Sequence, residues 1–111
     1  MKDFKAISYL SLRPLYYILE DKIPKPCSSE EFMKWGGYMA IDKRRVKETL
    51  FGDIRVSTVF LGLDHAYGSG PPMLFETMIF GGEHDEYQER YSIYEEAEKG
   101  HEKVVNMVLN K

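Results

Sequence analysis

The stretch that decides the fold is Ile54-Arg-Val-Ser-Thr-Val-Phe-Leu-Gly-Leu63. It begins with alternating apolar and polar residues and ends almost continuously apolar, which predicts a central strand covered on both faces. Residues 73–80 predict a second strand, and residues 45–51, which alternate less clearly, predict a third. Because the connections on either side of the central stretch resemble turns, we expect the three strands to pair as an antiparallel meander.

The flanking segments predict further short strands. Residues 15–19 form a compact apolar run rich in strand-forming side chains. Residues 23–26 contain two prolines, which keep the backbone extended but limit the segment to the edge of a sheet. Arg90-Tyr91 could add one more short strand before the C-terminal segment.

Two helices are expected, each opened by a capping-box pattern. The first begins after Ser28, with Glu31 three residues on, and should end at Gly36-Gly37. Its inner face is predicted to hold Phe32, Trp35 and Met39.

The second helix is longer. The segment Ser92–Glu95 provides its capping box, and it should extend to about Leu109. Its predicted inner face holds Ile93, Ala97, His101, Val104 and Val108. The predicted fold class is therefore α+β, an antiparallel sheet of three to five strands with one short and one long helix packed on it.

Size and composition describe one ordinary globular domain. The 111 residues are 43% hydrophobic and 30% charged, and we expect residues 1–111 to form a single domain with 1–13 only loosely attached. Cys27 is the only cysteine and cannot form an internal disulfide. There is no signal-peptide pattern and no apolar run long enough to cross a membrane, so a cytoplasmic location is expected.

Three sequence blocks carry a resemblance. They are Val56–His65, Gly70–Gly82 and Arg90–His101, within a similarity that covers roughly residues 15 to 108. They resemble a group of small uncharacterised proteins encoded by bacteriophages and prophages. The resemblance implies a phage or prophage setting and an intracellular site. It implies no activity and no catalytic residues.

The candidates for chemistry are Asp64, His65 and Glu76. Asp64-His65 follows the central strand and could serve acid–base chemistry or a metal, although loop-capping roles explain both residues as well. Glu76 lies in an apolar strand, where burial without a partner would raise its pKa. The alternative is a carboxylate that is paired with an arginine of a neighbouring strand, such as Arg55 or Arg45, or that points to a solvated rim, because buried charges are usually paired.

A metal or cofactor site is not expected. His65 and His84 should lie at opposite ends of a hairpin, about 25–30 Å apart at ~3.3 Å per residue, which leaves His101 with only one of them. The sequence contains no glycine-rich phosphate loop and no zinc-ligand spacing.

The charge is unevenly distributed. Residues 1–56 hold 11 Lys/Arg and 8 Asp/Glu, and residues 57–111 hold 4 and 10. Lys43–Lys47 could touch phosphates, but a charged edge strand explains it as well, and nucleic acid is not the expected partner. The acidic C-terminal part could mimic DNA or form a solvated surface (Glu83, Asp85, Glu86, Glu89, Glu95, Glu96 and Glu98).

Tyrosine and tryptophan are the residues most typical of protein interfaces, and this chain has eight tyrosines. The candidate binding residues are Tyr67, Tyr87 and Trp35, although aromatic residues also cover thin cores. We expect an accessory protein that binds a second copy of itself or a host protein. The alternatives are a small enzyme or metal-binding protein around Asp64, His65 and Glu76, and a nucleic-acid-directed protein or DNA mimic.

Overall fold

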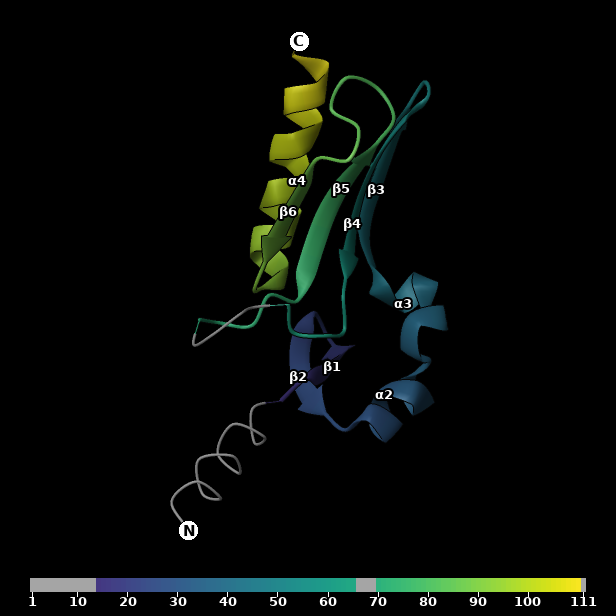
Figure 1. Ribbon diagram of the computed structural model, residues 1–111, viewed down its shortest axis with the longest axis vertical. Helices are drawn as coiled ribbons and strands as arrows, with labels where there is room; N and C mark the ends of the chain where they lie inside the picture. Colours follow the sequence, from purple (N-terminus) through teal and green to yellow (C-terminus); the bar gives the residue numbers. More distant parts are fainter. Residues whose placement is uncertain (1–13, 66–69, 111) are drawn as a thin grey trace.

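The computed structural model describes residues 14–65 and 70–110 and has the predicted α+β fold. A four-stranded antiparallel sheet carries a long helix, and a β-hairpin with short helices lies at one end (Figure 1). The sheet has the order β3 (Arg45–Phe51), β4 (Ile54–Phe60), β5 (Phe75–Phe80), β6 (Gln88–Tyr91). The remaining elements are β1 (Tyr16–Glu20), β2 (Ile23–Cys27), α2 (Ser29–Trp35), the 3-10 helix η1 (Gly37–Met39), α3 (Ile41–Arg44) and α4 (Tyr94–Leu109). Residues 1–13, predicted to be loosely attached, lie outside the described residues.

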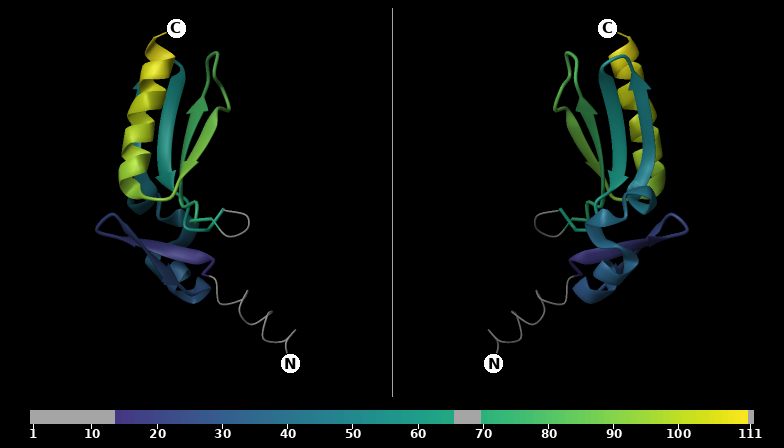
Figure 2. Two further views of the ribbon diagram at one scale, coloured as in Figure 1. Left: turned by 90° about the vertical axis from the view of Figure 1, so that its left-hand side faces the viewer. Right: turned by 90° about the vertical axis from the view of Figure 1, so that its right-hand side faces the viewer.

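The predicted strands and their meander are confirmed, but the central strand is covered by a helix on one face only. Along β4 burial alternates: Val56, Thr58 and Phe60 are fully buried, and Arg55 on the other face is exposed. Figure 2 shows α4 lying along a single face of the sheet. The prediction of two covered faces was wrong because the apolar run that suggested it leaves the sheet after Phe60. Leu61, beyond the end of β4, donates a backbone hydrogen bond to the carbonyl of Leu74 at 2.7 Å.

Helix α2 begins as predicted. Ser28 is the N-cap, and its side chain and that of Glu31 form both hydrogen bonds of a capping box. The helix ends at Gly36, whose φ of 124° is unfavourable for residues with a side chain. Met39 therefore does not share the inner face with Phe32. It lies in η1 and is 85% exposed, which corrects the predicted face.

Helix α4 packs on the sheet through the residues predicted for its inner face, except for the first of them. Ala97, His101, Val104 and Val108 are buried, whereas Ile93 is 51% exposed. The predicted capping box is absent, because Ile93 rather than Ser92 is the N-cap and makes no side-chain capping bond. The hydroxyl of Ser92 instead contacts the sulfur of Met73.

The hairpin is joined to the end of the sheet by backbone hydrogen bonds. Tyr17 donates to Gly62 at 2.9 Å, and Asp64 donates to Leu15 at 3.0 Å. An aromatic series continues this junction through the interior, with neighbouring ring centroids 5.4–6.2 Å apart: Tyr16, Phe32, Trp35, Phe60, Phe75 and Tyr94. The hairpin, α2 and the sheet therefore share apolar packing.

Gly62 makes this junction possible, and its substitution provides a test. Its φ is +81°, and a Cβ at this position would lie 2.5 Å from the Phe32 ring. We predict that Gly62→Ala lowers the free energy of unfolding by about 3 kcal/mol, from the clash and the left-handed backbone together. Urea unfolding followed by circular dichroism measures the loss.

Gly52→Ala is the matched control. Gly52 also has a positive φ, 61°, but nothing lies within 4 Å of its added Cβ. It should therefore lose only the backbone cost, about 1 kcal/mol. Equal losses in the two variants would contradict the role assigned to the contact between Gly62 and Phe32.

Candidate functional site

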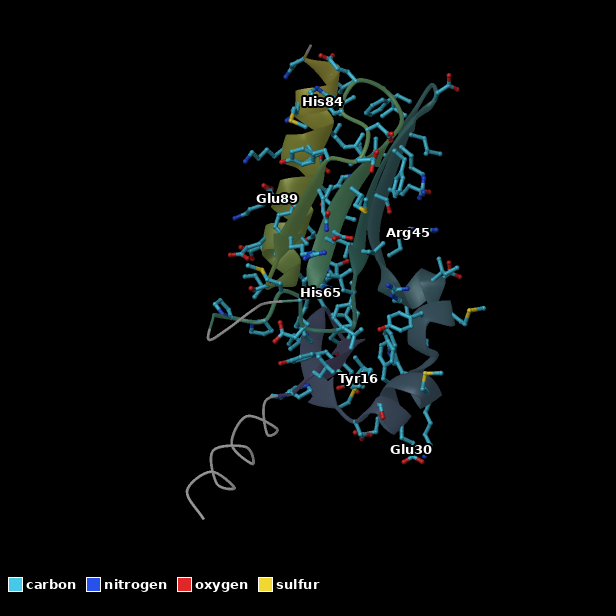
Figure 3. The ribbon with its side chains drawn as sticks, viewed as in Figure 1. Tyr16, Glu30, Arg45, His65, His84 and Glu89 are labelled. Atoms are coloured by element: carbon cyan, nitrogen blue, oxygen red, sulfur yellow. The ribbon has the colours of Figure 1, made fainter. Side chains whose placement is uncertain are left out.

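Asp64 and His65 follow the central strand, at the end of the sheet that faces the hairpin (Figure 3). Asp64 Oδ1 accepts a hydrogen bond from the backbone N–H of Met73 at 3.1 Å. The backbone N–H of His65 donates to the carbonyl of Met73 at 3.1 Å. Asp64 thus joins the two ends of the connection between β4 and β5, which is the loop-capping arrangement weighed for it above.

Glu76 lies on the sheet face away from α4 and is paired. Its Oε2 accepts from Arg90 Nε at 3.0 Å and also from the side-chain amide of Gln88. The arginine proposed from the sequence was Arg55 or Arg45, and the structure corrects this. Arg55 instead pairs with Glu48 at 3.2 Å and lies over the Phe80 ring. Asp64 and the backbone of His65 therefore both contact the backbone of Met73, whereas Glu76 pairs with a cross-strand arginine.

The three histidines lie apart. His65 and His84 are at opposite ends of the sheet in Figure 3. His101 is fully buried beneath α4, where both ring nitrogens have hydrogen-bond partners. Over residues 14–65 and 70–110, no group of three or more His, Cys, Asp or Glu side chains could hold a metal ion.

Within the basic stretch Lys43–Lys47, the cationic side chains contact the chain itself. Lys43 Nζ donates to the carbonyl of Trp35 at 2.7 Å and lies over its ring. Arg44 donates to the carbonyls of Phe60 at 2.9 Å and Tyr38 at 3.1 Å. Lys47 pairs with Glu102 of α4. Arg44 in particular ties the segment between α2 and β3 to the end of the central strand.

The predicted binding aromatics have different surroundings. Trp35 is half-buried and packs edge-to-face on Phe60, so much of its ring belongs to the core. Tyr87 is half-buried beside β6, where its hydroxyl donates to Glu89 Oε1 at 3.4 Å. Tyr67 lies outside the described residues. Cys27 is also half-buried, and burial together with the neighbouring Glu31 raises the pKa of its thiol, the reverse of an activated cysteine.

An exposed apolar surface lies on the segment between the end of α2 and the start of α3. Its four members are strongly exposed: Met33 66%, Tyr38 47%, Met39 85% and Ile41 58%. We call these four side chains the 33–41 surface. The sequence analysis missed it because it placed Met39 on an inner helical face. The double glycine at 36–37 was the available signal, since it ends the helix and turns the residues that follow outward.

Contacts with neighbouring side chains hold Tyr38 of the 33–41 surface in place. The Tyr38 ring packs edge-to-face on buried Phe32, with centroids 5.1 Å apart. The Arg44 guanidinium lies over the Tyr38 ring, 5.3 Å from its centroid. The surface is therefore apolar, partly methionine, and held in place by contacts with the core.

A second feature is a hydrogen-bonded series under α4, which we call the polar chain. It runs from Thr49 on β3 to His101 Nε2 (2.8 Å), and from His101 Nδ1 to Thr58 on β4 (2.7 Å). It continues from Thr58 to Thr77 on β5 (2.5 Å) and to the Tyr91 hydroxyl on β6 (3.2 Å). The Tyr91 hydroxyl also reaches Glu89 Oε2 at 3.4 Å. The polar chain thus touches all four strands.

The polar chain lies in an interior that excludes water from its middle. Thr58, Thr77 and His101 have no exposed area, and burial raises the pKa of Tyr91 to about 12. Every buried side-chain nitrogen and oxygen in the described part of the chain has a hydrogen-bond partner. Sequence reasoning placed His101 inward but did not find its threonine partners. Their alternate positions in β4 and β5 were the signal.

The chain was compared with protein-family models, with curated proteins and with solved structures, and none of the three comparisons found a match. The resemblance to phage and prophage proteins therefore stays a prediction. Among the described helices, none has the length and apolar character needed to cross a membrane.

The burial of His101 predicts how stability depends on pH. Burial lowers the pKa of its imidazole, and this outweighs the opposing effect of Glu102, while Lys47 acts in the same direction as burial. The unfolded chain therefore takes up a proton near pH ~6.5, before the folded chain does. Stability is full above that pH and falls as the pH decreases, by up to about 1.4 kcal/mol per pH unit between the two pKa values.

Urea unfolding between about pH 7 and pH 5 measures this slope. His101→Gln should remove much of it, and His84→Gln, a variant at a half-buried histidine outside the polar chain, should keep it. The slope within each variant is compared, so a lower absolute stability of His101→Gln does not affect the test. The same slope in all three proteins would contradict the assignment to His101.

Proposed function

We propose that this chain acts by binding another protein, as an accessory protein of bacteriophage or prophage origin. The observation that carries the proposal is the 33–41 surface. Isolated exposed apolar residues are ordinary, but four within one short segment are typical of interaction sites. The setting is supported by the sequence resemblance alone.

The composition of the surface fits a binding role. Methionine is flexible and polarizable, so it adapts to partners of different shape. Tyr38 adds a ring with a polar tip, a residue type enriched at interfaces. The contacts described above keep the backbone of the segment in place, so that binding requires little ordering of the chain.

The other exposed apolar side chains are dispersed over separate elements. Leu15 precedes β1, and Ile93 is the N-cap of α4. The others lie on β2, β3, β5 and the end of α4 (Ile23, Leu50, Phe80 and Leu109), and Ile23 and Ile93 line one open hollow. On the sheet face opposite α4, ion pairs separate the apolar residues: Arg55 with Glu48, and Arg90 with Glu76. Among the described residues, the 33–41 surface is thus the segment in which strongly exposed apolar side chains lie closest together in the sequence.

Met39→Glu, alone and with Met33→Glu, tests the proposal. A charge placed inside the contact should weaken binding at least about fivefold, because truncating a central interface residue costs over about 1 kcal/mol. Self-association is measured by sedimentation over a concentration series. Binding to a host protein is measured by quantitative mass spectrometry of proteins retained from bacterial lysate.

Leu50→Glu is the matched control, since Leu50 is 65% exposed but lies on β3. The proposal predicts that an association present in the natural chain is lost in Met39→Glu and kept in Leu50→Glu. A chain that stays monomeric and retains no lysate protein would overturn it. So would an association that Leu50→Glu removes and Met39→Glu leaves intact.

A further inference from the structure

The hydrogen bonds of the polar chain can be satisfied in two ways. Each hydroxyl has one proton to donate and can also accept, and a neutral imidazole donates from one nitrogen and accepts at the other. A hydroxyl that donates to one neighbour must accept from the other, so when every hydroxyl proton is used within the series, all the bonds run in the same direction. The links from Thr49 to Tyr91 form one unbranched series of this kind.

In the first orientation the proton of the Tyr91 hydroxyl points toward Thr77. Thr77 then donates to Thr58, Thr58 donates to His101 Nδ1, and His101 carries its proton on Nε2, which donates to Thr49. In the second orientation every bond is reversed. Thr49 donates to Nε2, Nδ1–H donates to Thr58, and the series ends with Tyr91 donating to Glu89 Oε2.

We propose that the polar chain is a two-state hydrogen-bond switch, in which the Glu89 carboxylate selects the tautomer of His101. The Tyr91 hydroxyl lies 3.2 Å from Thr77 Oγ1 and 3.4 Å from Glu89 Oε2, within reach of both acceptors. A bond to a charged carboxylate is stronger than one to a hydroxyl, so Tyr91 donates to Glu89 when the carboxylate, which also accepts from Tyr87, is free to accept. The remaining bonds follow, and His101 holds its proton on Nδ1. When Glu89 is removed or engaged elsewhere, Tyr91 donates to Thr77 and the proton resides on Nε2.

The number of protons is the same in both states. The four hydroxyls keep one proton each and rotate about their C–O bonds. The imidazole proton changes nitrogen, with one proton gained from water at Nδ1 and one lost to water at Nε2 when the helix opens locally. No other bond is made or broken.

The charged groups near His101 are few. Glu102 of α4 and Lys47 of β3 affect its pKa in opposite directions and pair with each other at the Thr49 end. β4 and β5 present only Thr58 and Thr77 to it. Glu89, which acts through Tyr91, is the only carboxylate that hydrogen-bonds to the described polar chain.

The switch relates the two edges of the sheet. Glu89 is on edge strand β6 and Thr49 on edge strand β3, three strand spacings or about 14 Å away. In Figure 3 Glu89 lies at the edge opposite Arg45, where β3 begins. A partner that engages Glu89 would thus change whether the Thr49 hydroxyl donates or accepts inside the protein.

The test is the tautomer of His101 in solution, read from long-range ¹H–¹⁵N NMR correlations of protein labelled at histidine. The His101 signals are those missing from His101→Gln. We expect mostly Nδ1–H in the natural chain. Tyr91→Phe removes the hydroxyl that ends the second orientation, and Glu89→Leu removes its acceptor, so both should change the majority form to Nε2–H.

Two further variants sharpen the test. Thr49→Val removes the acceptor needed by Nε2–H, and it should keep or increase the Nδ1–H form. Glu95→Leu, which removes an exposed carboxylate of α4 that contacts only Lys99, is the matched control and should change nothing. An Nε2–H majority in the natural chain would overturn the proposal, as would the same tautomer in Glu89→Leu and the natural chain. If Tyr91→Phe fails to fold, Glu89→Leu gives the decisive result.

Discussion

The fold depends on the need of one buried side chain for two hydrogen bonds. His101 lies between α4 and the sheet without solvent contact, and an unpaired ring nitrogen there would cost about 1–3 kcal/mol. Thr49 and Thr58 satisfy it from neighbouring strands. Because side chains alternate between the faces of a strand, a slip of one residue in the register would move these threonines to the other face. The hydrogen bonds of His101 thus select one pairing of the strands.

Apolar packing stabilises the same interface on both sides of the polar chain. Toward the hairpin, Phe60 and Phe75 pack with Ala97. Toward the other end of α4, Val56 and Ile79 pack with Val104 and Val108. These contacts bury apolar side chains between α4 and the sheet, and the hydrogen bonds of the polar residues between them select the strand register. The interface between α4 and the sheet is therefore specific, and the 33–41 surface lies outside it, on the segment that precedes the sheet.

The sequence predicted most of the strands and the long helix, because alternation and capping patterns are local signals. Ser28 and Glu31 are three residues apart, and their hydrogen bonds need nothing else. The predictions were wrong where the position of a side chain depends on a partner far away in the sequence. The partner of Glu76 depends on the β5–β6 pairing, so Arg90 could not be preferred to Arg55 or Arg45. Met39 was placed inward because the helical spacing was continued past Gly36, where the backbone turns.

The candidate site was predicted less well than the fold. Asp64, His65 and Glu76 were chosen for their chemistry, yet the Asp64 and Glu76 carboxylates accept hydrogen bonds from Met73 and Arg90, and the backbone of His65 is bonded to Met73. The 33–41 surface arises from the exposure of ordinary apolar residues, and the double glycine at 36–37 was its only local signal. The polar chain requires threonines from three strands to meet one histidine of a helix, and this follows only from the complete set of strand registers.

The central claim is that the chain works by binding a protein through the 33–41 surface, and methionine methyl NMR tests it most directly. The chain is labelled at its methionine methyl groups and observed in buffer over a concentration series, then in unlabelled bacterial lysate. The account predicts selective shifts or broadening of Met33 and Met39, while half-buried Met78 on the opposite sheet face and Met107 on α4 change little. Unchanged signals in every condition, or changes centred on Met78 and Met107 with Met33 and Met39 unaffected, would contradict it.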